Sequence, residues 1–176
     1  MTNTADDTIL GEGSWLRLKR AGKWEWVQRV NVTGVVGLYA FTDADEVVLV
    51  EQPRAPLGDA LVLEIPAGLA GDIIGQEDEA MERAAQRELV EETGYQAGEL
   101  REVVEIPSCP GITEETVHLY VARKLTKVGP GGGDETEQIE VYLVPMAEFH
   151  EFLEQRIQQG TWIDPKVFAV PYFHGQ

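Results

Sequence analysis

The sequence has 176 residues, of which 43% are hydrophobic, and this is enough for one globular domain with a buried core. Its 14 lysines and arginines stand against 31 acidic residues, which gives a net charge of −17. This excess disfavours a nucleic acid as partner, whereas a small anion could still bind beside a local arginine or a bound cation.

Short strands are expected to fill the first third of the chain. The predicted strands form two hairpins, Ser14–Arg20 with Lys23–Val32 and Val35–Phe41 with Glu46–Glu51. Their turns are Ala21-Gly22 and Thr42-Asp43-Ala44-Asp45. One more strand, Leu61–Ile65, is expected to end at Pro66-Ala67-Gly68.

The clearest helix is predicted over Asp78–Glu92. Its apolar residues recur at spacings of three and four and form one stripe, namely Ala80, Met81, Ala84, Ala85 and Leu89. The acidic run Gln76–Glu79 stands near its N-terminus, where the helix dipole favours negative charge. Gly94 stands where a left-handed C-cap belongs.

The rest of the chain alternates strands and helices. Strands are predicted at Glu99–Ile106, Thr116–Ala122 and Gln138–Val144, and helices at Met146–Gln158 and Pro165–Tyr172. The glycine run Gly129–Gly133 is expected to be a flexible loop. Many strands with few helices predict an α/β fold in which a mixed sheet is covered on both faces.

The predicted helix carries a row of carboxylates. Glu88 and Glu92 lie about 40° apart around the helix axis, and Glu91 lies about 60° to the other side. Like charges placed in this way repel each other, and a hard divalent cation bound by oxygen atoms would reverse the sign of that interaction. The alternative interpretation is an acidic helix face exposed to water.

The same stretch resembles the Nudix box, in which a Gly, five residues, a Glu and seven residues precede Arg-Glu-aliphatic-x-Glu-Glu-x-Gly-aliphatic. Glu79 lies eight positions before Arg87, as this pattern requires. The residues from Arg87 to Gly94 then match in turn, with Tyr95 in place of the last aliphatic residue. Ile73 stands where the first Gly belongs, so we align Gly68 with it and place a five-residue insertion within Leu69–Asp78.

Further motifs resemble the ADP-ribose and nucleoside-diphosphate-sugar pyrophosphatase branch of the Nudix hydrolases. They are Gln52-Pro53-Arg54, Glu64-Ile65-Pro66-Ala67-Gly68, and Pro110 sixteen residues after Gly94. The resemblance implies a Nudix α/β/α sandwich with a mixed sheet, preceded by a small N-terminal antiparallel sheet. We accordingly divide the chain into an N-terminal β-hairpin subdomain, residues 1–32, and a Nudix catalytic domain, residues 33–176. Members of this branch commonly dimerise through the N-terminal sheet, so a homodimer is expected.

The resemblance implies an enzyme that uses Mg²⁺, for which Mn²⁺ can substitute. Its expected reaction is hydrolysis of the pyrophosphate link of ADP-ribose or a related nucleoside diphosphate sugar, which gives a nucleoside monophosphate and a sugar phosphate. One alternative is another Nudix specificity, such as GDP-mannose, coenzyme A, dinucleoside polyphosphates or capped RNA. Another is a Nudix-like module that binds a nucleotide without cleaving it, although no box carboxylate is missing here.

Metal-binding roles carry over from the family residue by residue. Glu88 and Glu92 are expected to be the principal ligands together with the backbone carbonyl of Ala67, and Glu91 to hold a second ion directly or through water. These ligands are all oxygen atoms, which suits Mg²⁺. Arg87 is expected to orient the carboxylates and to pair with Glu91. We expect Glu79 to be structural, since on the helix it would lie about 180° from Glu88.

In this branch the general base lies on a mobile loop outside the helix. Asp134-Glu135-Thr136-Glu137 follows the glycine run here and matches that placement. Alignment of the next strand favours Glu137, with Glu135 second, and the alternative is a solvated acidic loop. The glycines would let this loop close on the substrate.

Three residues are candidates for substrate binding. Arg54 is expected to clamp a phosphate through paired hydrogen bonds, and the alternative is a surface salt bridge. Trp24 is a candidate for stacking against the base, with Arg29 nearby. The alternative for Trp24 is burial in the small sheet or in a dimer seam, which Trp15 and Trp26 could instead build.

The sequence also indicates where the protein works. No apolar run approaches the roughly 20 residues of a membrane-spanning helix, and residues 1–7 lack the pattern of a signal peptide. Cys109 is the single cysteine, which excludes an intrachain disulfide and agrees with a reducing compartment. We therefore expect a cytoplasmic protein that binds a small nucleoside diphosphate derivative and no membrane.

Overall fold

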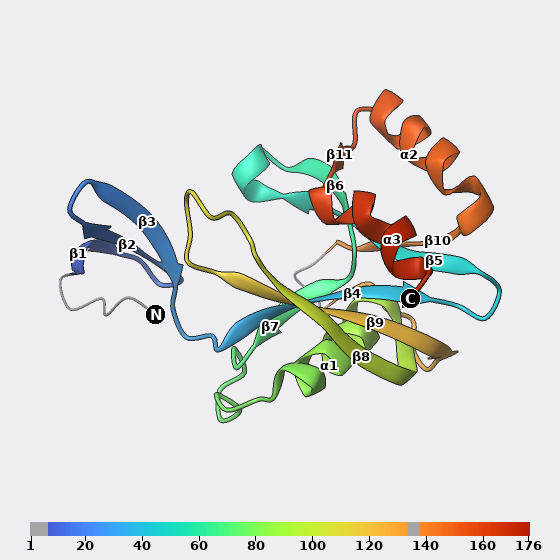
Figure 1. Ribbon diagram of the computed structural model, residues 1–176, viewed down its shortest axis with the longest axis horizontal. Coiled ribbons are helices and arrows are strands. Elements are labelled where there is room, and N and C mark those ends of the chain that lie inside the picture. Colours follow the sequence, from blue (N-terminus) through green and yellow to red (C-terminus); the bar gives the residue numbers. More distant parts are fainter. Residues whose placement is uncertain (1–6, 134–137) are drawn as a thin grey trace.

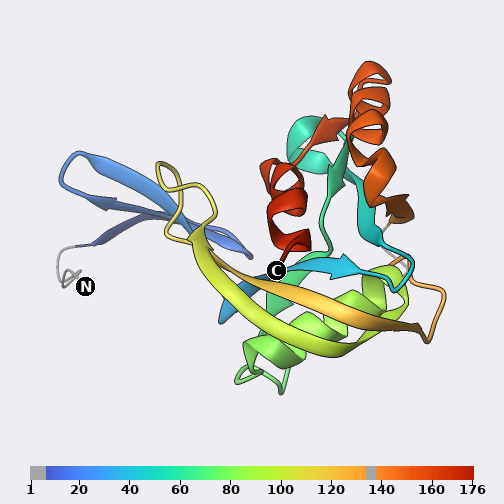
Figure 2. The same cartoon turned by 45° about the vertical axis from the view of Figure 1, so that its right-hand side comes forward.

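The computed structural model describes residues 7–133 and 138–176. In this part of the chain a large mixed sheet carries helices on both faces, and a smaller sheet projects from it at the N-terminal end (Figure 1). Figure 2 shows the same arrangement from the side, with the C-terminal helices above the large sheet and one helix below it.

The small sheet is an antiparallel meander of three strands. They are β1 (Thr8–Glu12), β2 (Leu16–Ala21) and β3 (Trp24–Arg29). The pair β2 and β3 is the predicted first hairpin, and β1 is an added strand that was not predicted, because its sequence TILGE does not alternate apolar with polar residues. The N–H of Val27 donates to the carbonyl of Ile112 at 2.8 Å, which ties the small sheet to the β8–β9 connection.

The large sheet contains the remaining strands. They are β4 (Gly34–Phe41), β5 (Glu46–Arg54), β6 (Ala60–Glu64), β7 (Ala67–Ala70), β8 (Tyr95–Pro107), β9 (Thr116–Lys127), β10 (Glu140–Pro145) and β11 (Trp162–Ile163). The order is β11-β6-β5-β4-β9-β8, with β10 paired to β5 and β7 paired to β4. The pairs β4·β9 and β6·β11 are parallel and the others are antiparallel, so the sheet is mixed as predicted.

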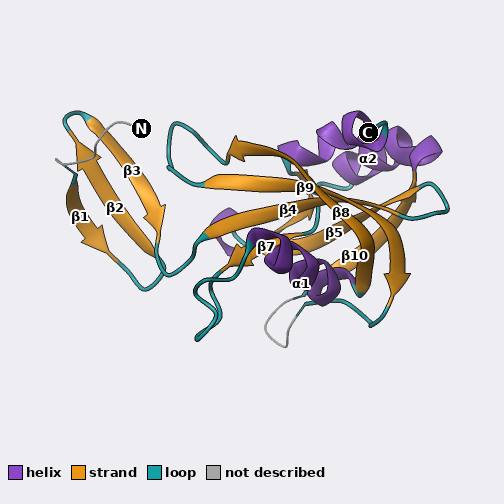
Figure 3. Cartoon of the chain, turned by 60° about the horizontal axis from the view of Figure 1, so that its bottom comes forward, coloured by secondary structure: helices purple, strands orange, loops and turns teal. Residues whose placement is uncertain are grey.

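Helices cover the two faces of this sheet. They are α1 (Met81–Thr93), α2 (Phe149–Gln158) and α3 (Val170–His174), with short 3₁₀ turns at η1 (Ala55–Leu57), η2 (Met146–Glu148) and η3 (Pro165–Ala169). Side chains of β4 alternate between the faces: Val36 and Leu38 pack in the cluster with α1, whereas Tyr39 and Phe41 pack in the cluster with α2 and α3. Figure 3 shows α1 and the C-terminal helices on opposite sides of the strands. The predicted α/β/α sandwich is thereby confirmed.

Helix α1, on which Glu88, Glu91 and Glu92 lie, begins later than predicted. Its first residue is Met81, and Ala80 before it has an extended backbone. The segment in front of it is a series of turns, in which the N–H of Gln76 donates to Ile73 and that of Glu79 donates to Gln76. Glu79 therefore lies outside the helix. At the other end Gly94 takes the predicted left-handed C-cap conformation, with φ of 72°.

Strand β7 was not predicted. Pro66-Ala67-Gly68 was expected to stop a strand, and β6 does end at Glu64, but the chain then starts a new strand at Ala67 that pairs with β4. This pairing satisfies the backbone of a short glycine-containing segment that has little strand propensity of its own. None of the helices in residues 7–133 and 138–176 is long and apolar enough to cross a membrane.

Candidate active site

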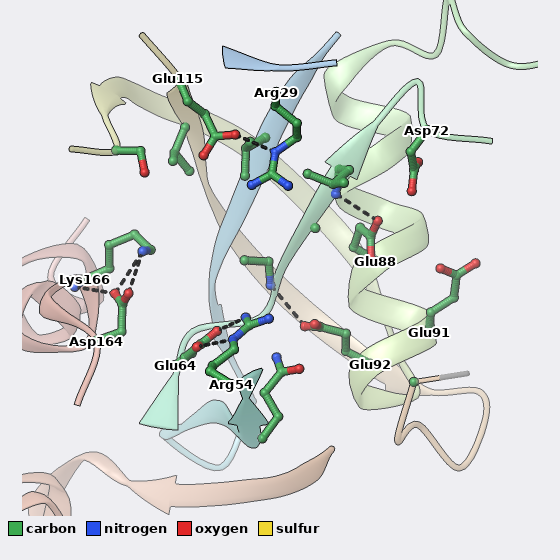
Figure 4. Close-up of a pocket in the computed structure, with 18 of the residues that line it drawn as sticks. Arg29, Arg54, Glu64, Asp72, Glu88, Glu91, Glu92, Glu115, Asp164 and Lys166 are labelled. Carbon is green, nitrogen blue, oxygen red and sulfur yellow. Dashed lines mark hydrogen bonds and ion pairs between the residues drawn. The ribbon is translucent and has the colours of Figure 1, made fainter. Parts of the chain in front are cut away.

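A cavity of about 590 Å³ opens between β7, α1 and the start of η3. Most of the side chains that line it are charged or polar, and Figure 4 shows ten of them labelled. Its acidic lining residues are Glu64, Asp72, Glu88, Glu91, Glu92, Glu115 and Asp164, and its basic ones are Arg29, Arg54, Arg87 and Lys166. Ala67 and Gly68 of β7 complete the wall beside the helix.

Strand β7 lies directly against the carboxylates of α1. A β-carbon on Gly68 would lie 2.0 Å from Cδ of Glu88, so any other residue at this position would displace the Glu88 carboxylate. The N–H of Leu69 donates to Oε1 of Glu88 at 3.2 Å, and the N–H of Ala67 donates to Oε2 of Glu92 at 3.0 Å (Figure 4). Backbone amides of one strand thus fix two carboxylates one helical turn apart.

The three carboxylates of α1 share the cavity but differ in exposure. Glu88 and Glu92 are buried, with 9% and 5% of their surface exposed, whereas the Glu91 side chain is 52% exposed. Burial raises the pKa of Glu88 to about 7, and Arg87 opposes that rise. A bound cation would favour the ionised form of such a buried carboxylate.

Arg87 connects the acidic groups around the helix. Its guanidinium lies 2.8 Å from Glu88, 3.0 Å from Glu91 and 3.0 Å from Glu79. It also donates to the carbonyl of Leu69 at 2.8 Å. The predicted pairing of Arg87 with Glu91 is present. The predicted place of Glu79, on the helix and opposite Glu88, is wrong, because Glu79 precedes the helix and reaches back to Arg87.

Three more basic residues reach the cavity, and each one is held by a carboxylate. Arg29 lies 2.7 Å from Glu115, and Nζ of Lys166 lies 2.9 Å from Asp164. Arg54 bonds to both oxygens of Glu64, and it still lines the cavity with 43% of its side chain exposed (Figure 4). The salt bridge that stood as the alternative for Arg54 is therefore present, and it holds the guanidinium at the cavity wall.

Asp164 and Lys166 are cavity residues that sequence reasoning missed. Asp164 followed by Pro165 is a helix-start signal, and Asp164 does accept a hydrogen bond from the N–H of Lys166. That local signal does not predict where η3 lies relative to the cavity. Its position is set by the N–H of Asp164, which donates to the carbonyl of Leu63 at 2.9 Å and so anchors η3 to β6.

The structure does not bring every predicted site residue to the cavity. Trp24 is 67% exposed at the tip of the β2–β3 hairpin and does not line the cavity, so its role in stacking stays a prediction. Trp26 donates from Nε1 to Glu114 at 2.7 Å. Glu135 and Glu137 lie outside the described residues.

The described residues of the glycine run, which was expected to be a flexible loop, are hydrogen-bonded to the end of α1. The N–H of Gly132 donates to the carbonyl of Glu92 at 2.7 Å, and that of Gly133 donates to Glu91 at 3.0 Å. A β-carbon on Gly131 would lie 2.4 Å from the carbonyl carbon of Thr93. The last carbonyls of a helix lack partners within the helix, and these amides supply them.

The residues of this cavity suit a divalent cation. Buried carboxylates and backbone carbonyls are hard oxygen donors, and Gly68 leaves the space that a β-carbon would fill next to Glu88. Within the described residues no three acidic, histidine or cysteine side chains already converge on one point. Glu88 and Glu92 each accept a hydrogen bond from an amide of β7 at one oxygen, and an ionised carboxylate has further lone pairs that can bind an ion.

Comparisons with known proteins agree with this fold. The chain is similar to the crystal structure of an ADP compounds hydrolase, with a TM-score of 0.68 and 18% identity, over 96% of this chain and 89% of that one. This likeness shows the fold. The NUDIX domain model matches residues 31–164. The chain belongs to the Nudix family.

Sequence relatives lie in the predicted branch. The chain is 34% identical to the ADP-ribose pyrophosphatase of Bacillus subtilis, over 77% of this chain and 70% of that one. It is 31% identical to the GDP-mannose pyrophosphatase of Cronobacter sakazakii, over 94% of this chain and 82% of that one. It is also 34% identical to the methanol dehydrogenase activator of Bacillus methanolicus, over 81% of this chain and 73% of that one. The predicted membership of the Nudix hydrolases is confirmed, and with it the prediction of an enzyme that acts on diphosphate links.

Proposed function

We propose that this chain hydrolyses the pyrophosphate link of ADP-ribose or a related nucleoside diphosphate sugar, with Mg²⁺ as its cofactor. The products would be a nucleoside monophosphate and a sugar phosphate. The observation that carries the proposal is one cavity with two buried carboxylates, Glu88 and Glu92, on one side and the basic residues Arg29, Arg54 and Lys166 around the rest. Its likeness to an ADP-ribose pyrophosphatase favours the same substrate class.

Glu88 and Glu92 are the proposed principal metal ligands, with the carbonyl of Ala67 and with Glu91 as a further ligand. When bound, Mg²⁺, or Mn²⁺ in its place, would neutralise diphosphate oxygens and acidify a water molecule. The chain itself fixes the ligands. Backbone N–H groups of β7 hold the two buried carboxylates. Arg87 donates hydrogen bonds to both Glu88 and Glu91 and so orients them along the same edge of the helix.

The basic residues are proposed to bind the diphosphate. Arg54 has the planar donors that pair with phosphate oxygens, and Glu64 already holds it at the cavity wall. Arg29 is held in the same way by Glu115. Because the whole chain carries a charge of −17, these local cations and the bound Mg²⁺ together would offset the repulsion of an anionic substrate.

The general base is proposed to be Glu137, with Glu135 as the second candidate. Gly133, which lines the cavity and bonds to the carbonyl of Glu91, is the last described residue before them. Glu137→Gln and Glu135→Gln can be compared in single-turnover assays at saturating Mg²⁺. The variant with the larger fall in the single-turnover rate constant identifies the base, and equal small effects would exclude both.

GDP-mannose is a second candidate substrate. It is favoured by the relative from Cronobacter sakazakii, a GDP-mannose pyrophosphatase that aligns with 94% of this chain. Purified protein can be assayed with ADP-ribose, ADP-glucose, GDP-mannose and coenzyme A, each with Mg²⁺ and with chelator as the control. We expect ADP-ribose to have the highest kcat/KM. Turnover of coenzyme A alone would exclude the nucleotide-sugar proposal.

We also propose a cytoplasmic homodimer that joins through the N-terminal sheet, with residues 1–32 as the dimerisation unit and 33–176 as the catalytic domain. Large hydrophobic side chains are exposed on and next to that sheet, namely Ile9, Leu10, Trp15, Leu16, Leu18 and Trp24. Exposed apolar patches of this kind are typical of interfaces. Light scattering of the Trp15→Glu variant is expected to show a monomer. Trp162→Glu serves as the control, because Trp162 is also exposed but lies on β11 of the large sheet.

A further inference from the structure

The connection between β8 and β9, residues 108–115, is a place where the small sheet contacts the rest of the chain (Figure 1). The N–H of Val27 on β3 donates to the carbonyl of Ile112 at 2.8 Å, and the same strand residue forms an isolated parallel bridge with this connection. The connection is itself closed by a hydrogen bond from the N–H of Ser108 to the carbonyl of Glu115 at 2.9 Å. It therefore offers β3 a defined edge.

Glu114 of this connection contacts three side chains of the small sheet. Its Oε2 accepts a hydrogen bond from Nε1 of Trp26 at 2.7 Å, and its Oε1 accepts one from Nε2 of Gln28 at 2.6 Å. Nζ of Lys19 lies 3.6 Å from Oε2. Lys19 is the cross-strand partner of Trp26, and Gln28 lies two positions further along β3, so the three donors share one face of the small sheet.

The neighbouring pair of residues makes a contact inside the charged cavity. Arg29 follows Gln28 on β3, and because side chains alternate along a strand it leaves the sheet on the other face. Its Nε donates to Oε1 of Glu115 at 2.7 Å, and both residues line the charged cavity (Figure 4). Two consecutive acids of one connection thus hold β3, Glu114 from outside the cavity and Glu115 from within it.

We propose that Glu114 is a positioning residue for the reaction, which docks the small sheet so that Arg29 stays in the charged cavity. The proposal rests on the proposed function, in which Arg29 binds the diphosphate, and extends it to a residue that does not line the cavity. The pair of Arg29 with Glu115 is partly exposed, with 35% and 17% of the two side chains accessible. An ion pair of this kind contributes little to holding a whole sheet in place.

The covalent link between the two sheets leaves the small one free to change its angle. It consists of residues 30–33 between β3 and β4, and Asn31 within it has a left-handed backbone with φ of 60°. Short connections of this kind are where parts of a protein hinge. If the small sheet docks for only a fraction of the time, the apparent affinity for the diphosphate falls in proportion to that fraction. Bound substrate would itself favour the docked state, so the rate at saturation should change little.

Glu114→Ala in the full chain tests this proposal with ADP-ribose and Mg²⁺. We expect KM to rise by about three- to ten-fold and kcat to stay within about two-fold, as for a loss of partly exposed contacts that changes binding alone. Glu12→Ala is the matched control. It removes the same charge and an ion pair, but the partner Arg17 lies within the small sheet, and the exposure of Glu12 is 46% against 42% for Glu114. An equal KM in these two variants would overturn the proposal.

A double-mutant cycle shows whether Glu114 acts through Arg29. In an Arg29→Ala background, Glu114→Ala should give no further rise in KM, because the group that it positions is already absent. The same rise in both backgrounds would overturn the proposal, since Glu114 would then act on another group. Glu114→Gln keeps one carbonyl oxygen as an acceptor and should raise KM less than Glu114→Ala. It serves as the second variant if Glu114→Ala does not fold.

Hydrogen exchange of the Val27 N–H, without substrate, measures the docking itself. This amide should exchange about three- to ten-fold faster in Glu114→Ala than in the wild type and in Glu12→Ala, as expected when partly exposed contacts are lost. Equal exchange in all three would overturn the docking role, whatever KM does. Faster exchange in a protein that hydrolyses no nucleoside diphosphate sugar would support the docking role and contradict the proposed function.

Discussion

Gly68 lies so close to Glu88 that a β-carbon on Gly68 would be 2.0 Å from Cδ of the glutamate. Such a distance forces one of the two groups to move. The backbone of β7 and the carboxylate of α1 are thus fitted to each other. The alignment of Gly68 with the first glycine of the family pattern stays a prediction.

Gly68→Ala should therefore damage the site more than the fold. The added methyl group must displace the Glu88 carboxylate, at a cost of about 1–3 kcal/mol in unfolding free energy. Turnover should fall by at least about ten-fold, because Glu88 loses its position. Gly11→Ala is the control, since a β-carbon on Gly11 meets nothing within 4 Å. Equal activity in the two variants would show that the contact is unimportant.

Arg87 is expected to act by positioning and not by touching the substrate. Lysine at this position keeps the charge but cannot contact Glu79, Glu88 and Glu91 with one planar group. Arg87→Lys should lower kcat by about 10–100-fold, as loss of a residue that orients metal ligands typically does. It should also weaken Mg²⁺ binding, measured by calorimetry, while KM changes little.

The control for Arg87 is Arg83→Lys, an exposed position on the same helix that lines no part of the cavity. Its kcat should stay within about two-fold of the wild type, as expected for a surface substitution. If both lysine variants lose kcat to the same degree, the effect belongs to the helix as a whole, and the positioning role of Arg87 is wrong.

The glycine run supports the end of α1 and can be tested there. Gly131 has φ of 72° and a β-carbon would meet Thr93, so Gly131→Ala should cost about 1–3 kcal/mol and lower the Tm. Gly129→Ala lies two residues away, has no positive φ and meets nothing within 4 Å, so its Tm should hardly change. A lower Tm in both glycine variants, or in neither of them, would contradict the close packing of Gly131 against the end of α1.

Local patterns in the sequence predicted most of this fold. The spacing of Ala84, Ala85 and Leu89 identified α1, the family box gave its carboxylates, and Gly94 gave its end. Continuous apolar runs rich in β-branched residues gave β4 and β5, which are buried on both faces of the sheet. These features depend on neighbours within a few residues.

Other features depend on contacts between distant segments, and no local pattern contains them. Strand β7 exists because β4 pairs with it, and Asp164 reaches the cavity because η3 is anchored to Leu63 of β6. The docking of Gly132 on Glu92 is of the same kind. Five neighbouring residues rich in glycine did not predict this docking, in which the amides of Gly132 and Gly133 bond to carbonyls at the end of the helix.

The central claim is that Glu88 and Glu92 hold a divalent cation next to the diphosphate. Calorimetric titration of Mg²⁺, with and without AMP, into the wild type, Glu92→Gln and the exposed control Glu82→Gln tests it most directly. We predict Mg²⁺ uptake by the wild type and the control, and loss of uptake in Glu92→Gln together with a fall in turnover of several orders of magnitude. The absence of Mg²⁺ uptake by the wild type under both conditions, or full uptake and turnover in Glu92→Gln, would contradict the claim.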